Sequence, residues 1–160
     1  MSALDRLVPQ SRVWIYGAER ALTSAETATV RKELQAFVAN WVSHRNELDA
    51  AADVLYDRFI VIAVDETQAE ASGCSIDGSV HFLQDLSARL GVDFFNRMIF
   101  SYRDADGTIH TVPRDEFKNR YKAGQLPDDT IVFDPLVKEL GELRQIFERP
   151  FEDSWHSRMV

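Results

Sequence analysis

An uninterrupted apolar run, Phe59-Ile60-Val61-Ile62-Ala63-Val64, constrains the fold of this chain more than any other segment. A strand with one solvated face alternates polar and apolar residues, whereas a run without any polar residue predicts a strand covered on both faces. β-Branched residues dominate the run, and they favour a strand over a helix. The rest of the chain must therefore supply packing elements for both sides of this strand.

The segments around this run predict an alternation of strands and helices. Thr23-Ser24-Ala25-Glu26 matches a capping box, and apolar residues at helical spacing follow from Val30 to Trp41. We therefore expect a helix from Thr23 that ends near Ser43 and His44. A second helix is expected over 76–90, where Gly91 provides the stop. Strands are expected over 13–16, 48–57, 59–64 and 97–102, with a tight turn at Asp57-Arg58.

The resulting order, β-α-β-β-α-β, is that of the ferredoxin-like sandwich. We expect an α+β fold in which both helices pack on one face of an antiparallel sheet. The hairpin signal Asp106-Gly107 then opens a C-terminal β/α extension, with a strand over 108–112, a helix over 114–123, a strand over 130–133 and a helix over 136–147. A chain of 160 residues suits a single domain, with its core over about 11–104 and the extension over about 105–160.

The aromatic residues at these elements are expected to be core residues, because each lies on or beside an apolar periodic segment. They are Trp14, Tyr16, Trp41, Phe94 and Phe95. The C-terminal tail with Trp155 and His156 is expected to dock on the domain, because an exposed tryptophan is unusual.

The net charge of −8 disfavours nucleic acid as a partner, because binding to phosphates needs clustered Lys and Arg. No apolar stretch approaches the length of a membrane span, and the N-terminus lacks the apolar core of a signal peptide. A single cysteine cannot form an intrachain disulfide. We therefore expect a cytoplasmic protein without a membrane span.

The single cysteine, Cys74, stands near the expected start of the second helix, where free N–H groups stabilise a thiolate. Eight carboxylates and two arginines lie between His44 and Val80, and such an acidic environment raises the pKa of a thiol. Two roles stay open for Cys74: a buried structural residue, which is common for a free cysteine, or a nucleophile. We expect burial and the acidic environment to dominate, so that the thiol reacts slowly.

If Cys74 is catalytic, His44 is the candidate base and Asp65 or Asp77 the carboxylate that orients it. His44 can equally be a cation at the end of the first helix. The candidate binding residues of this site are Arg58, Ser75 and Arg97. We expect no metal, because no spacing matches a metal-binding loop, and no cofactor.

The segment that contains Cys74 spaces Gly73 and Gly78 as a P-loop does. However, Ser79 stands where a P-loop has its phosphate-binding lysine, and Asp77 adds a negative charge inside the loop. The sequence therefore predicts no ATP binding.

Six segments together carry a resemblance to a known family: Ser11-Arg12-Val13-Trp14-Ile15-Tyr16, Trp41-Val42-Ser43-His44, Arg58-Phe59, 71–77, Asp93-Phe94-Phe95-Asn96-Arg97 and Asp153-Ser154-Trp155. From Ser11 to Trp155 the chain resembles a family of bacterial proteins of unassigned activity that is often labelled "ABC transporter ATPase". The missing P-loop lysine conflicts with that label. Arg45 departs from the family, whose members more often have glycine after the histidine, and this weakens the expectation of a tight turn there.

Two classes of function follow from these observations. We expect a binding or assembly module that engages another protein through an aromatic and acidic surface, or that self-associates. The alternative is a small cysteine-dependent enzyme or redox sensor that uses Cys74 with His44 and Asp65 or Asp77.

Overall fold

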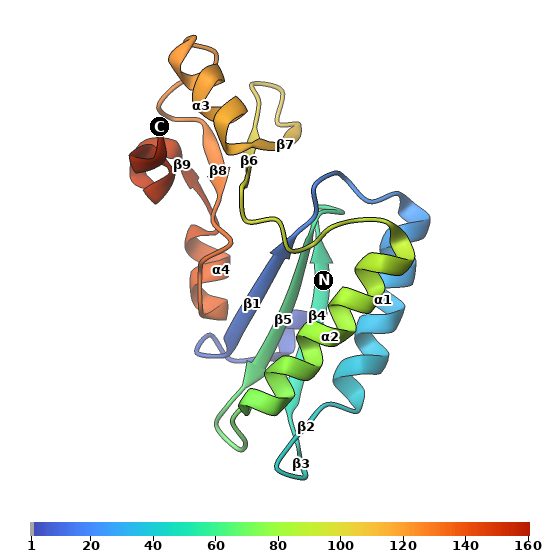
Figure 1. Ribbon diagram of the computed structural model, residues 1–160. Helices are drawn as coiled ribbons and strands as arrows, with labels where there is room; N and C mark the ends of the chain where they lie inside the picture. The colour runs from blue at the N-terminus through green and yellow to red at the C-terminus, as the bar shows by residue number, and fades with distance from the viewer. Residues whose placement is uncertain (1) are drawn as a thin grey trace.

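The structure is a computed structural model that describes residues 2–160, and it confirms the α+β class. Two antiparallel sheets are its main elements (Figure 1). The first has the strand order β1-β5-β4, and its strands are β1 (Arg12–Gly17), β4 (Asp49–Leu55) and β5 (Phe59–Asp65). The second has the order β7-β6-β8-β9, and its strands are β6 (Ile99–Arg103), β7 (Ile109–Pro113), β8 (Ile131–Phe133) and β9 (Glu148–Pro150). A small hairpin joins β2 (Val42–Ser43) to β3 (Asn46–Glu47).

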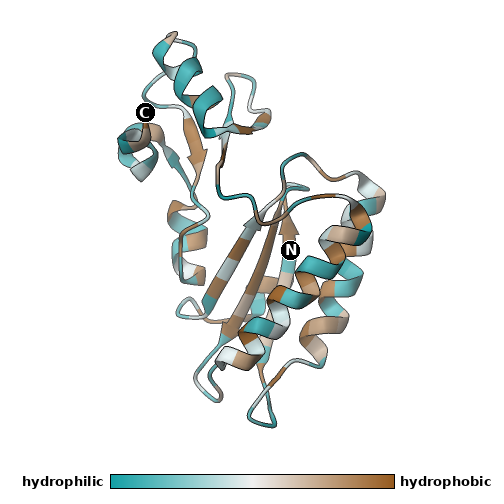
Figure 2. Cartoon of the chain, viewed as in Figure 1, coloured by the Kyte–Doolittle hydropathy of each residue, from teal (hydrophilic) through white to brown (hydrophobic). Residues whose placement is uncertain are grey.

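The apolar run forms β5, the central strand of the first sheet, and its residues 59–64 are all buried. Helices α1 (Ser24–Ala39) and α2 (Gly73–Leu90) lie side by side over one face of this sheet (Figure 1). The other face packs against the 3₁₀ helix η1 (Ala3–Arg6), the helix α4 (Leu140–Ile146) and Phe133 of β8. The predicted coverage of β5 on both faces is therefore confirmed. Figure 2 shows this strand as a brown, hydrophobic band.

The start of each long helix is set by a capping residue. Thr23 accepts a hydrogen bond from the N–H of Glu26, whose carboxylate accepts one from the N–H of Thr23, so the predicted capping box is confirmed. Ser72 caps α2 by accepting from the N–H of Ser75, and Gly91 ends α2 in the left-handed conformation. Helix α2 therefore begins three residues before its expected start at Ile76.

The expected four-stranded ferredoxin-like sheet is not confirmed. Strand β6, the expected fourth strand, belongs to the second sheet, where it pairs with β7 from Ile99↔Pro113 to Arg103↔Ile109. Gly107, with a φ of +82°, forms the turn after β6, so the chain reverses and β7 pairs with β6. This local pairing joins β6 to the segment that was expected to be an extension of the domain.

The second sheet packs against α3 (Arg114–Lys122) and two short C-terminal 3₁₀ helices, η2 (Phe151–Asp153) and η3 (Trp155–Met159). His156 is buried and Trp155 packs against this cluster, so the expected docking of the tail is confirmed. Arg58 links the two sheets, because its guanidinium donates to Thr111 Oγ1 at 2.8 Å and to the carbonyl of Ile109 at 2.9 Å.

Two other boundaries differ from expectation. The helix expected over 136–147 begins only at Leu140, because residues 138–140 pair with the start of β1. Inside α4, Gly141 lies against Pro9, whose carbonyl accepts the Gly141 N–H at 2.9 Å. The turn between β4 and β5 centres on Tyr56 and Asp57, one residue earlier than expected, and both have a positive φ.

No helix in residues 2–160 combines the length and apolar character that a membrane span requires.

Candidate functional site

Cys74 lies in the first turn of α2, and its side chain is exposed. The expected burial of this residue is therefore wrong. Because α2 begins at Gly73, the inward positions of its first turns are Ser75 and Ser79, and both of these are buried. The helix start turns the thiol toward solvent.

The residues expected to assist Cys74 lie on separate elements. His44 is exposed at the tip of the β2–β3 hairpin, so its expected place at the end of α1 is wrong. Helix α1 stops at Ala39, and Trp41 turns inward where the hairpin begins. Asp65 accepts from the N–H of Thr67 after β5, and Asp77 is exposed on α2. Among residues 2–160, no hydrogen bond joins Cys74 to any of these three.

Two of the candidate binding residues have structural partners. The carbonyl of Ser75 accepts from Trp41 Nε1 at 2.8 Å, and its hydroxyl donates to the carbonyl of Ser72. Arg58 is bound to β7, and burial lowers its pKa. The described residues also contain no group of three His, Cys, Asp or Glu side chains arranged to hold a metal ion. The roles of Cys74, His44, Asp65 and Asp77 stay predictions.

The third candidate, Arg97, lines a cavity of about 610 Å³ between the two sheets, which we call the inter-sheet cavity. One wall is β1 from Arg12 to Gly17, and another is the segment from Phe94 to Ser101, which leads into β6. The remaining wall combines residues 135–138 with Phe133, Trp155 and His156. The volume falls within the usual range for ligand sites.

Three cationic side chains line this cavity, and the first is Arg12. Its guanidinium lies over the ring of Trp14, 4.6 Å from the ring centroid. The other two are Arg97 and Lys138, and each of the three is also exposed to solvent. No carboxylate is among the described lining residues. Three acidic residues adjoin lining residues in the sequence: Asp93 and Glu139 are exposed outside the lining, and Asp134 is buried and is bound by Arg149 and by Trp155 Nε1. The cavity is thus locally cationic in an acidic chain.

Aromatic side chains provide much of the apolar wall. Tyr16 and Phe95 meet edge to face, with centroids 5.5 Å apart, and Trp14 meets Trp41 in the same way at 6.2 Å. Burial raises the pKa of Tyr16, and the charge of Arg97 opposes this rise. The Tyr16 hydroxyl therefore keeps its proton at neutral pH.

His156 is the most buried polar residue of the cavity wall, with an exposed fraction of 1%. Ser154 Oγ lies 2.5 Å from His156 Nδ1 and accepts from the His156 N–H, so its hydroxyl proton is available to Nδ1. In that tautomer Nε2 carries the ring proton. Within the described chain Nε2 has no hydrogen-bond partner. The fully buried side-chain atoms without a partner are Ser11 Oγ, Ser43 Oγ and Arg149 Nε, so Nε2 is not fully buried. Burial lowers the pKa of His156 to about 4, so the ring is neutral at pH 7.

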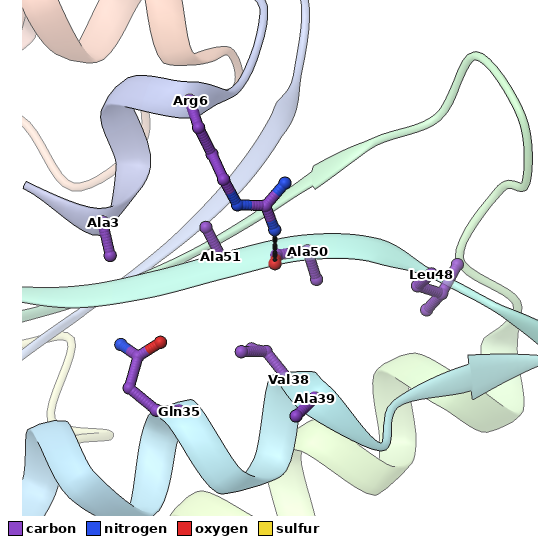
Figure 3. Close-up of a pocket in the computed structure, with 8 residues that line it drawn as sticks. All are labelled: Ala3, Arg6, Gln35, Val38, Ala39, Leu48, Ala50 and Ala51. Atoms are coloured by element: carbon purple, nitrogen blue, oxygen red, sulfur yellow. Dashed lines mark hydrogen bonds between the residues drawn. The ribbon is translucent and has the colours of Figure 1, made fainter.

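A second cavity, of about 300 Å³, lies between η1, α1 and β4 (Figure 3). Figure 3 shows Arg6 reaching the carbonyl of Ala50, to which it donates a hydrogen bond. Gln35 donates to the carbonyl of Ala52. Both polar side chains of this cavity therefore already form hydrogen bonds within the protein, and we assign no ligand to the cavity.

Sequence reasoning treated the aromatics at Trp14, Tyr16, Phe94 and Phe95 as core residues, although they also line the inter-sheet cavity. The signal that could have shown this is the charge beside them, since Arg12 adjoins the first pair and Arg97 follows the second. Lys138 and His156 had no such signal. They are far from β1 in the sequence, and only the tertiary fold brings them to the same cavity.

Comparisons of the chain with protein-family models, with curated proteins and with solved structures found no match.

Proposed function

We propose that this protein is a binding module whose inter-sheet cavity receives an acidic, partly apolar segment of a partner protein. The observation that carries the proposal is a reversal of charge. The chain has a net charge of −8, yet its inter-sheet cavity is lined by three cations and, among the described residues, by no carboxylate. A partner with acidic groups is attracted to this cavity and repelled by most of the remaining surface.

The chemistry of the walls supports the same partner. Arginine pairs with carboxylates through parallel N–H donors, and Arg12 is oriented by its contact with Trp14. Aromatic walls supply apolar contact area, and burial of aromatic anchors provides most of the binding energy in many interfaces. An acidic segment that also carries apolar side chains uses both features.

The cysteine-enzyme alternative has less support. An activated thiol needs a base within hydrogen-bond reach, and the part of the chain that the structure describes forms no hydrogen bond between Cys74 and His44. Cys74 also lines neither of the two cavities described above. A cytoplasmic location and self-association remain predictions.

The proposal can be tested by selecting random peptides displayed on phage against the immobilised protein. The selected peptides should contain Asp or Glu together with apolar residues. Synthetic copies should change the tryptophan fluorescence of the Trp41→Phe variant, in which only Trp14 and Trp155 remain, and both of these line the cavity.

Charge reversal provides the matched control. Arg97→Glu should weaken binding of the selected peptide by about tenfold or more, because an exposed cation at the cavity becomes an anion. Lys32→Glu makes the same change of charge at an exposed position on α1 and should leave the affinity within about twofold. The proposal fails if no peptide is enriched, if the enriched peptides lack acidic residues, or if both variants bind alike.

A further inference from the structure

The inter-sheet cavity contains the open edge of a β-strand. Strand β1 is at the end of the order β1-β5-β4, and its whole length from Arg12 to Gly17 pairs with β5. On its other side only the start of β1 has partners. The N–H of Val13 donates to the carbonyl of Lys138, and the N–H of Leu140 donates to the carbonyl of Ser11.

These contacts determine which backbone groups of β1 point away from β5. The N–H and C=O of one residue point to the same side of a strand, and the side alternates from residue to residue. Ser11 and Val13 bond outward, whereas Ala18 bonds toward the β4–β5 turn through the carbonyl of Arg58. The next outward positions after Val13 are therefore Ile15 and Gly17. Among residues 2–160, neither residue has a hydrogen-bond partner on this side.

The opposite wall is also incompletely paired. Strand β6 meets β8 only at Tyr102↔Val132, and β8 ends at Phe133. Ile99 and Phe100 thus lie beyond the end of β8 and line the same cavity. Unpaired strand edges are templates for pairing with another chain, and folded proteins normally cover or block them. Here the edge of β1 is left open inside a cavity with aromatic walls and a cationic lining.

The imidazole of His156 offers a ligand in this cavity a second kind of hydrogen-bonding group, beside the edge of β1. It lines the wall with an exposed fraction of 1%, and the described structure contains no partner for its Nε2. Nε2 is not among the fully buried atoms without a partner, so it is accessible from the cavity, where a bound group can accept its hydrogen bond. A peptide carbonyl is such an acceptor.

From these observations we infer that the partner segment binds as an added β-strand on the open edge of β1, with backbone hydrogen bonds to Ile15 and Gly17. The inference rests on the proposed function, because it concerns the same cavity and the same acidic segment. Strand addition obtains affinity from backbone hydrogen bonds and selectivity from the side-chain sites on either side. The cations Arg12, Arg97 and Lys138 then select acidic side chains or a terminal carboxylate.

Gly17 allows a matched test of the edge. Gly17→Pro removes the outward N–H and fills its place with the ring, but it breaks no bond to β5, so proline is tolerated there as on other strand edges. Gly17→Ala adds a Cβ at an ordinary contact distance, 3.6 Å from the Phe59 ring, and keeps the N–H. Using the peptide selected on phage, we expect Gly17→Pro to weaken binding by about tenfold or more and Gly17→Ala by less than about threefold.

The peptide supplies the second half of the test. Its backbone amides are methylated one at a time, which removes each donor while the side chains stay. Strand addition predicts that alternate positions lose affinity by about tenfold and that the positions between them do not. Circular dichroism and the urea midpoint of the Gly17→Pro variant establish that it is folded.

The outcomes separate this inference from the proposed function. A peptide that binds and depends on Arg97, but shows no alternation and no difference between the two Gly17 variants, overturns strand addition and leaves the proposed function standing. A selection that yields no peptide overturns both. If the Gly17→Pro variant does not fold, the methylation pattern measured on the native protein decides the question alone.

Discussion

At the scale of single residues, Trp41 is the clearest case of a position that both packs and bonds. Its side chain is buried, with an exposed fraction of 6%, and its indole N–H binds the Ser75 carbonyl at the start of α2. Trp41→Ala should lower the free energy of unfolding by about 3–5 kcal/mol, because it leaves a cavity and an unpaired carbonyl. Trp41→Phe keeps most of the volume and should cost roughly 1–2 kcal/mol. Urea denaturation measures both, and an unchanged midpoint for Trp41→Ala would contradict the packing.

His156 makes stability depend on pH in a defined window. Its pKa is about 4 in the folded protein, chiefly because of burial, against 6.5 for the unperturbed side chain. The unfolded chain therefore binds more protons between these values, so folding stability is fully present above about pH 6.5 and falls as the pH drops toward 4. The loss should be about 3 kcal/mol.

The measurement is urea denaturation of the native protein and of His156→Gln at several pH values in this window. The variant cannot titrate at this position, so its stability should change less with pH. His81→Gln alters an exposed histidine of α2 and should keep the pH dependence of the native protein. Equal pH dependence in the native protein and His156→Gln would exclude His156 as the cause.

Residue by residue, much of the candidate site was out of reach from the sequence. The burial of Trp41 could be anticipated from the apolar pattern, although Trp41 lies beyond the end of α1, and Arg97 was correctly singled out although its binding role stays a prediction. The orientation of Cys74 could not be anticipated, because the expected helix did not include it, whereas in α2 it stands off the buried face that Ser75 and Ser79 begin. His156 could not be placed either, since its neighbours come from β6 and α3.

At the scale of secondary-structure elements, the β2–β3 hairpin carries local backbone strain. Its turn residues, His44 and Arg45, have φ values of +49° and +69°, the conformation of a turn that favours Asn-Gly. A tight turn forms here although Arg45 weakened the expectation of one. Arg45→Gly should raise the free energy of unfolding by about 0.5–1 kcal/mol, because a side chain at positive φ is strained. Arg45→Ala keeps that strain and should give no gain in a thermal melt.

Elements with local signals were predicted well, and elements that depend on distant contacts were not. The capping box of α1 and the Asp106-Gly107 hairpin are set within a few residues, and both are confirmed. The start of α4 depends on Pro9 and on pairing with β1, which lie more than a hundred residues away in the chain. The choice of sheet for β6 is of the same kind, because a strand pattern indicates that a strand forms but not which neighbour it takes.

At the scale of the whole molecule, the two sheets are joined by few polar contacts, and Arg58 makes two of them. Arg58→Met should lower the free energy of unfolding by about 2 kcal/mol, because the Ile109 carbonyl loses a charged donor. Unfolding can be followed separately in the two halves. Trp41 reports on the first sheet in a variant without the other tryptophans, and Trp155 reports on the second in the same way.

The two reporters should give one urea transition in the native background, and Arg58→Met should move the Trp155 transition below that of Trp41. Lys32→Met removes an exposed cation from α1 and should leave the two transitions together. If the Trp41 and Trp155 transitions of Arg58→Met coincide at the urea midpoint of the native protein, the apolar contacts alone couple the unfolding of the two sheets.

The central position of β5 has a consequence for how the molecule opens. Each residue from Phe59 to Val64 is buried and lies opposite partners on both β1 and β4. Each β5 N–H bonds to only one of the two flanking strands, so a local fluctuation that releases β1 or β4 frees only alternate amides of β5, and the full set reaches solvent only when both strands have separated. Their hydrogens should be the slowest in the chain to exchange with deuterium, and the rate of that exchange should report the free energy of global unfolding.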